Sequence, residues 1–115
     1  MQHLYQIRHI SVSEKRLKQE LSAADMKKAM DQLTEQFMEA RELIEDARES
    51  METVYFSDDM AEAQEAVTTT LDQYQKLLSQ LSESQRQEVL RTIGLRMEEL
   101  KAQEQALKDA VLDSH

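Results

Sequence analysis

The sequence predicts an all-α fold, namely an antiparallel three-helix bundle of coiled-coil type with a long first helix. Two observations support this prediction. The 115 residues include no proline and a single glycine, Gly94, so the chain lacks the turn residues that join the strands of a β-sheet. Apolar residues also recur at alternating steps of four and three residues, the spacing that holds one side of a helix against another helix.

The first predicted helix covers about residues 12–56 and follows an N-terminal arm, residues 1–10. Ser11 and Glu14 have the spacing of a capping box, which indicates a helix start. The apolar seam of this helix comprises Met26, Met30, Leu33, Phe37, Ala40, Ile44, Ala47, Met51 and Val54.

Leu17 and Leu21 precede the seam and are out of phase with it. Ser22, next to this change of phase, could serve as a second N-cap. The sequence therefore leaves open whether one bent helix or two helices pass through residues 22–25.

The second predicted helix covers residues 58–81. Ser57 is expected to cap it, and two aspartates follow at the positive end of its dipole. Its seam consists of Met60, Val67, Leu71, Tyr74, Leu78 and Leu81, with Gln64 as the polar member.

The third predicted helix covers residues 83–113, after a capping box formed by Ser82 and Gln85. Its seam consists of Leu90, Ile93, Met97, Leu100, Leu107 and Val111. Glu104 occupies one seam position, so we expect it to have a basic partner or to lie near an open end. Residues 11–115 are thus interpreted as one helical domain.

The formal net charge of −9 is unevenly distributed, at +3 over residues 1–28, −11 over residues 29–75 and −1 over residues 76–115. Such an acidic middle is unsuited to nucleic acid, because binding to phosphates requires clustered Lys and Arg. There is no cysteine, and no apolar run approaches the roughly 20 residues that span a bilayer. We therefore expect an intracellular, cytoplasmic protein, although residues 1–10 could also be the remnant of a targeting sequence.

No group in the sequence is placed for catalysis or metal binding. His3, His9 and His115 lie near the termini, and none has a ligand partner one helical turn away. There is no glycine-rich phosphate loop and no nucleotide-binding fingerprint. We expect no enzyme activity, no cofactor, no metal and no small-molecule substrate.

The residues predicted to bind a partner fall into two groups. An acidic strip lies two positions beyond the seam and comprises Glu35, Glu39, Glu42, Asp46 and Glu49. This strip could be a solvated face or a docking site for a basic partner. Leu17 and Leu21 would lie on a helix end that the other two helices do not reach. Arg41 and Arg48 flank the seam and are expected to form interhelical ion pairs.

These observations favour a non-enzymatic protein–protein interaction module. In the leading hypothesis, the projecting first helix forms a homodimer or pairs with another subunit of a complex. An acidic adaptor that docks a basic surface is an alternative. A peripheral membrane binder using the basic residues 1–28 is another.

Overall fold

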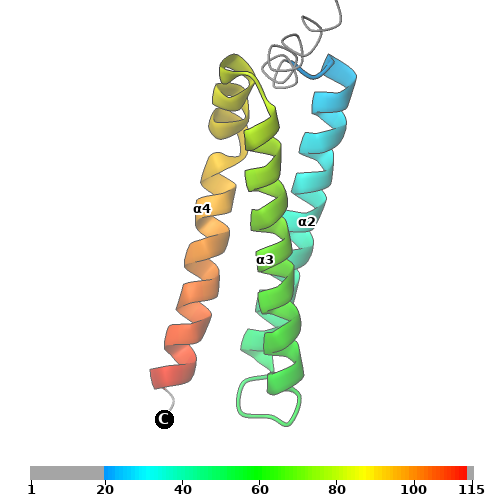
Figure 1. Ribbon diagram of the computed structural model, residues 1–115. Coiled ribbons are helices and arrows are strands. Elements are labelled where there is room, and N and C mark those ends of the chain that lie inside the picture. Colours follow the sequence, from blue (N-terminus) through cyan, green and yellow to red (C-terminus); the bar gives the residue numbers. More distant parts are fainter. Residues whose placement is uncertain (1–19, 114–115) are drawn as a thin grey trace, which may run out of the picture.

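The computed structural model describes residues 20–113 and confirms the all-α, antiparallel three-helix bundle. The helices are α2 (Ala23–Glu49), α3 (Phe56–Gln80) and α4 (Glu83–Asp113). Each helix runs antiparallel to the one before it, so α2 and α4 are parallel (Figure 1). The predictions for residues 1–19, including the capping box at Ser11 and the contact at Leu17, lie outside the described residues.

The start of α2 answers the question that the sequence left open at residues 22–25, because a new helix begins there within the predicted range 12–56. Glu20 and Leu21 are not helical, and Ser22 has the extended backbone of an N-cap with ψ 161°. The hydroxyl oxygen of Ser22 accepts a hydrogen bond from the Asp25 N–H at 3.0 Å. This bond satisfies one of the free donors of the first turn, so Ser22 acts as the second cap that the sequence allowed.

The end of α2 differs from the prediction, because the helix stops at Glu49 and not near Phe56. Glu52 adopts a left-handed backbone with φ 69°, and the hydroxyl of Thr53 donates to the Ser50 carbonyl at 2.6 Å. These local hydrogen bonds replace the i→i−4 backbone hydrogen bonds that would continue the helix. The predicted seam therefore ends at Met51, and Val54 is 86% exposed in the turn.

The start of α3 differs in its cap. The helix begins at Phe56 after Tyr55, which makes no side-chain capping bond, and Ser57 lies inside the first turn. The prediction that Ser57 is the N-cap is therefore wrong. Phe56 is half-buried against the core, which favours a start two residues earlier than a Ser57 cap would allow.

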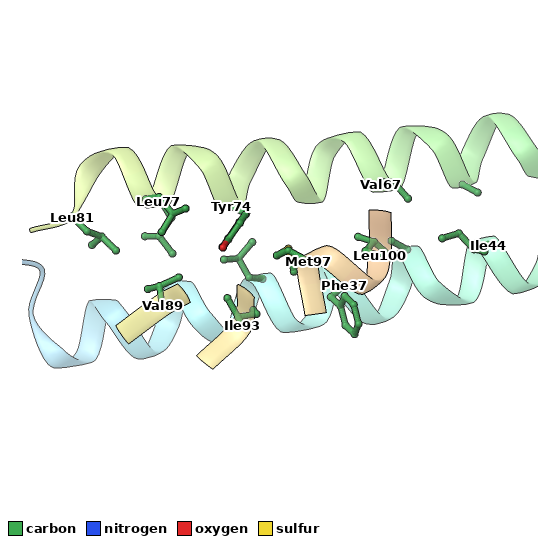
Figure 2. Close-up of a cluster of buried hydrophobic side chains, with 14 of the residues drawn as sticks. Phe37, Ile44, Val67, Tyr74, Leu77, Leu81, Val89, Ile93, Met97 and Leu100 are labelled. Carbon is green, nitrogen blue, oxygen red and sulfur yellow. The ribbon is translucent and has the colours of Figure 1, made fainter. Parts of the chain in front are cut away.

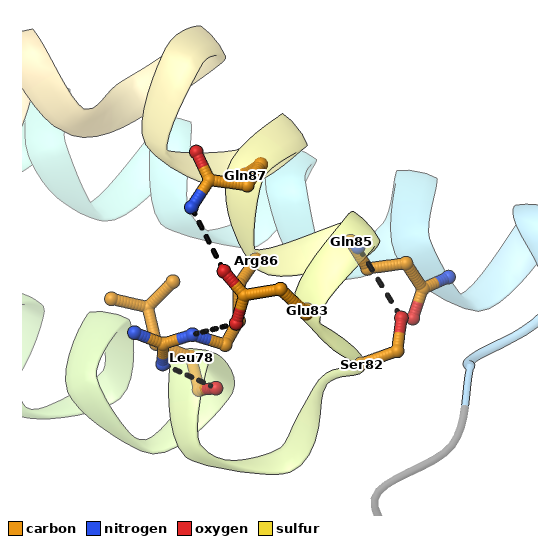
Figure 3. Close-up of polar contacts among 6 residues, drawn as sticks. All are labelled: Leu78, Ser82, Glu83, Gln85, Arg86 and Gln87. Carbon is orange, nitrogen blue, oxygen red and sulfur yellow. Dashed lines mark hydrogen bonds and ion pairs between the residues drawn. The ribbon is translucent and has the colours of Figure 1, made fainter.

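The connection between α3 and α4 is stabilised by side chains of the first turn of α4 (Figure 3). The Gln85 N–H donates to the Ser82 hydroxyl at 3.3 Å, which is one half of the predicted capping box. The other half is replaced, because the Gln85 side chain bonds to the main chain of Leu21. Arg86 donates to the Leu78 carbonyl at 3.0 Å, near the end of α3. A turn without glycine or proline is possible here because side chains satisfy the free backbone groups.

The core lies along the axis of the bundle, where buried side chains from all three helices meet (Figure 2). The α2 seam is confirmed, since six of its members are buried: Met26, Leu33, Phe37, Ala40, Ile44 and Ala47. The buried residues of α3 are Ala63, Val67, Thr70, Tyr74, Leu77 and Leu78. Those of α4 are Gln85, Val89, Ile93, Met97, Leu100 and Leu107.

The predicted seams of α3 and α4 are confirmed in part, but the buried sides of both helices are wider than predicted. The confirmed members are Val67, Tyr74 and Leu78 on α3, Leu81 at its C-cap, and Ile93, Met97, Leu100 and Leu107 on α4. On α3, Ala63, Thr70 and Leu77 are buried although the sequence pattern did not place them on the seam. On α4, Val89 is fully buried in place of the predicted Leu90. Both helices contact two neighbours, so the side that faces the core is wider than a single coiled-coil seam.

Glu104 has the basic partner that its seam position required. Its side chain is 19% exposed, and its Oε1 lies 3.8 Å from the Nζ of Lys108. A half-buried carboxylate is thereby kept next to a positive charge one helical turn away.

Candidate functional site

The predicted acidic strip is exposed along the second half of α2. Its members Glu35, Glu39, Glu42, Asp46 and Glu49 all lie on the solvent side of the helix. They do not border one surface, however. Glu39 faces the groove between α2 and α3, Asp46 and Glu49 lie near the turn after α2, and Glu42 borders a hollow on the side of α4.

The groove between α2 and α3 is an acidic concave surface to which both helices contribute carboxylates. It has a volume of about 380 Å³ and carries three carboxylates, Glu39, Glu62 and Glu65. None of its lining residues is basic. The complete lining is Gln36, Glu39, Leu43, Glu62, Glu65, Ala66, Thr69 and Thr70. We call this surface the acidic groove.

The floor of the acidic groove contains polar atoms from both helices. The hydroxyl of buried Thr70 donates to the Ala66 carbonyl at 2.8 Å and lies 3.4 Å from the Gln36 carbonyl oxygen. The side-chain Oε1 of Gln36 is buried and has no hydrogen-bond donor among the described residues. An unpaired buried acceptor costs about 1–3 kcal/mol, so a donor that reached this oxygen would be bound favourably.

A second acidic hollow continues the same side of the molecule towards the turn after α2. Its lining includes Asp46 and Glu49 from α2 and Asp59 from α3. The polar side chains of Ser50 and Thr53 and the ring of Tyr55 complete it. Two of the predicted strip residues therefore lie in a hollow that α3 helps to form.

Leu21 does not lie on a projecting helix end. It is half-buried against the core, and its main chain is hydrogen-bonded to the side chain of Gln85 on α4. The expectation that α3 and α4 leave this region uncovered is therefore wrong at Leu21. The first turn of α4 reaches this level of the bundle because α3, with 25 residues, carries the chain back along nearly the whole of the 27-residue α2.

The two arginines beside the seam do not form the predicted interhelical ion pairs. Arg48 pairs with Glu45 of its own helix at 3.1 Å. Arg41 lies over the Phe37 ring, with its Cζ 5.5 Å from the ring centroid. Both border a hollow of about 420 Å³ between α2 and α4, together with Met38, Glu42, Ile44, Glu45 and Gln103.

No group of three or more His, Asp or Glu side chains within residues 20–113 is arranged to hold a metal ion. None of the three helices in this range is long and apolar enough to cross a membrane.

Glu62 and Glu65, the α3 residues of the acidic groove, were missed from the sequence. In an antiparallel hairpin, residues equally distant from the turn lie opposite each other, as Gln36 and Thr70 do here. The position of the turn at residues 50–55 would have placed Glu65 near the acidic strip. The sequence pattern put this turn near residue 57, which would instead have set Glu65 opposite Glu49 and away from Glu39.

Comparison with known proteins places the chain among helical domains. A family model described as "Embryogenesis-like protein helical domain" matches residues 27–109, which include most of all three helices. The chain is also similar to a protein of Arabidopsis thaliana named "Embryogenesis-like protein", with 38% identity over 88 residues. This alignment covers 76% of the chain and 50% of the relative, so the chain spans about half the length of that relative. No solved structure matches the chain significantly.

Proposed function

The chain belongs to the Embryogenesis-like protein helical domain family, and we propose that it is a non-enzymatic interaction module that binds a basic segment of a partner protein. The acidic groove is the binding site in this proposal. The observation that carries it is the meeting of Glu39 with Glu62 and Glu65 across the contact between α2 and α3.

Electrostatics supports a basic ligand. The three carboxylates make no ion pair with any Lys or Arg in residues 20–113. Their mutual repulsion is relieved when a cationic side chain enters between them. A patch of one sign also steers a partner of the opposite sign and raises its association rate.

The shape and polarity of the groove support a lysine or arginine side chain. Leu43 and Ala66 provide apolar walls for an aliphatic stem. The charged head would lie between the carboxylates, and the unpaired Oε1 of Gln36 could accept one of its hydrogen bonds. A partner helix with Lys or Arg at successive turns would extend towards Asp46 and Asp59 in the second hollow.

The test uses a synthetic lysine-rich amphipathic helical peptide as the probe. Its affinity is measured by titration calorimetry for the wild-type chain and for a variant with Glu39→Gln, Glu62→Gln and Glu65→Gln. We expect a loss of at least about tenfold in affinity, since each desolvated charge pair contributes about 1 kcal/mol or more. Higher salt should weaken binding to the wild type.

A matched control removes the same net charge elsewhere, by Asp72→Asn, Glu88→Gln and Glu99→Gln, three exposed positions outside the acidic groove. This variant should bind the peptide nearly as well as the wild type. Equal loss in both variants would mean that the peptide responds only to net charge, and the acidic groove would be rejected as the site. In NMR spectra, the largest backbone amide shift changes on peptide binding should be those of Gln36 and Thr69.

A further inference from the structure

Two arginines from different helices converge on one aromatic ring on the other side of α2. The Cζ of Arg41 lies 5.5 Å from the centroid of the Phe37 ring, and the Cζ of Arg96 on α4 lies 6.0 Å from it. The side chain of Phe37 points away from α3 (Figure 2) and is only 4% exposed.

Neither of these guanidinium groups has an anionic partner in residues 20–113. The other arginines beside the core differ, because Arg48 pairs with Glu45 and Arg86 lies 3.8 Å from Glu83. The fold therefore holds two positive charges at one ring without a direct ion pair to either, although Glu42 and Glu45 line the same hollow as Arg41. Two such charges repel each other, and an anion between them converts that repulsion into attraction.

The chemistry of the arginine pair favours a carboxylate. A guanidinium over an aromatic ring keeps its N–H donors available, and their fork matches the two oxygens of a carboxylate. Contact with the ring of Phe37 also restrains each side chain, which lowers the entropy lost when a ligand binds.

The surroundings of the arginine pair indicate that this carboxylate belongs to a protein segment. Arg41 also borders the hollow between α2 and α4, in which Ile44 is buried and Met38 is 58% exposed. Apolar surface next to a cationic pair suits an acidic side chain that has an apolar neighbour one helical turn away. A free inorganic anion would make no use of Met38.

We propose that Arg41 and Arg96 form a binding site for the carboxylate of an acidic residue in a partner segment, with an apolar residue of that segment against Met38. This site is separate from the acidic groove and has the opposite charge preference. It does not depend on the function proposed above.

The test uses a capped helical peptide in an alanine–glutamine background with one leucine and one glutamate four residues apart. Binding is followed by NMR at the side-chain Nε–Hε groups of Arg41, Arg96 and Arg91. We expect saturable shifts at Arg41 and Arg96 and none at Arg91, which is exposed and contacts neither Phe37 nor the hollow. A peptide with glutamine in place of glutamate should produce no saturable shift.

Three single variants, Arg41→Gln, Arg96→Gln and Arg91→Gln, each remove one positive charge. The first two variants should bind the peptide at least about fivefold more weakly than the wild type, because each removes a charge-assisted hydrogen bond. The third should bind the peptide with unchanged affinity. Arg41→Lys keeps the charge but loses the fork, and should also bind more weakly. Thermal unfolding of each variant checks that the bundle remains intact.

Two outcomes would overturn the proposal. One is the absence of saturable shifts at Arg41 and Arg96 up to the solubility limit of the peptide, or equal shifts with the glutamine peptide. The other is equally strong saturation of both arginines by inorganic phosphate alone, which would assign the pair to free oxyanions and not to a protein carboxylate.

Discussion

The side-chain amide of Gln85 makes two hydrogen bonds with the main chain of Leu21, 64 residues away in the sequence. Its Oε1 accepts from the Leu21 N–H at 2.9 Å, and its Nε2 donates to the Leu21 carbonyl at 2.9 Å. The amide thus pairs with the backbone as a neighbouring strand would. This contact fixes the chain immediately before α2 against the first turn of α4.

Replacement of Gln85 by Glu should lower the free energy of unfolding by about 1–3 kcal/mol, because a carboxylate cannot donate to the Leu21 carbonyl and leaves it unpaired. Urea unfolding measures this change, and amide exchange at Leu21 should become faster. The matched control is Gln87→Glu, on the exposed side of the same turn, where Gln87 bonds only to Glu83. Equal effects of the two substitutions would contradict the role given to Gln85.

The stability of the bundle should fall at alkaline pH through Tyr74. Burial raises the pKa of the Tyr74 hydroxyl above its ordinary value of 10.0, and nearby Glu98 adds to this shift. The folded state therefore holds the proton more tightly than the unfolded chain. The resulting stabilisation is complete below pH 10 and is lost as the pH rises through the pKa of the folded state.

The Tyr74→Phe variant tests this pH dependence, because it removes the ionisable group and keeps the ring. Its stability should decline less steeply above pH 10 than that of the wild type. Tyr55→Phe, at a residue that is 69% exposed, serves as the control and should follow the wild-type profile. Identical slopes for Tyr74→Phe and the wild type would argue against the shifted pKa.

Gly94 should tolerate alanine. A Cβ at this position would lie 3.4 Å from the hydroxyl oxygen of Tyr74, an ordinary van der Waals distance. Alanine inside a helix is about 1 kcal/mol more favourable than glycine, so Gly94→Ala should raise the unfolding free energy by up to that amount. Thermal melts of Gly94→Ala and Gly94→Leu provide the comparison, and the larger side chain should be destabilising. Destabilisation by alanine itself would mean that α3 and α4 lie closer than the structure places them.

Two leucines of α4 should respond very differently to the same truncation. Leu100 is fully buried, so Leu100→Ala should cost about 2–5 kcal/mol through lost burial and the cavity left behind. Leu95 is 73% exposed, so Leu95→Ala should change the stability by less than about 0.5 kcal/mol. Chemical denaturation of both variants gives the two values. Similar values would mean that α4 is rotated about its axis relative to the structure described.

Much of the fold could be predicted from the sequence, because helix formation and the seam of α2 depend on local spacing. Ser82 correctly indicated the start of α4. Ser22 was identified as a possible cap, but the sequence did not decide whether a helix begins after it. The predictions failed where a residue fits the helical spacing but its neighbours form a turn. Val54 fits the heptad spacing, yet the backbone bonds of Thr53 and the left-handed Glu52 end the helix before it.

The candidate sites could be predicted only in part. The acidic strip of α2 was evident from its spacing, whereas Glu62 and Glu65 join Glu39 only once the hairpin is closed. The convergence of Arg41 and Arg96 on Phe37 similarly requires two helices to be parallel and level with each other.

The sequence by itself thus determined the helical class, the number of helices in the described region and the buried side of α2, since these follow from residue propensity and a seven-residue period. Only the tertiary structure decided how far the buried sides of α3 and α4 extend beyond their predicted seams, how far α4 reaches along α2, and which charges meet across the grooves. Those properties depend on the rotation and axial offset of packed helices. Both are set by the fit of side chains from all three helices at once, and a periodic pattern along one helix does not contain that information.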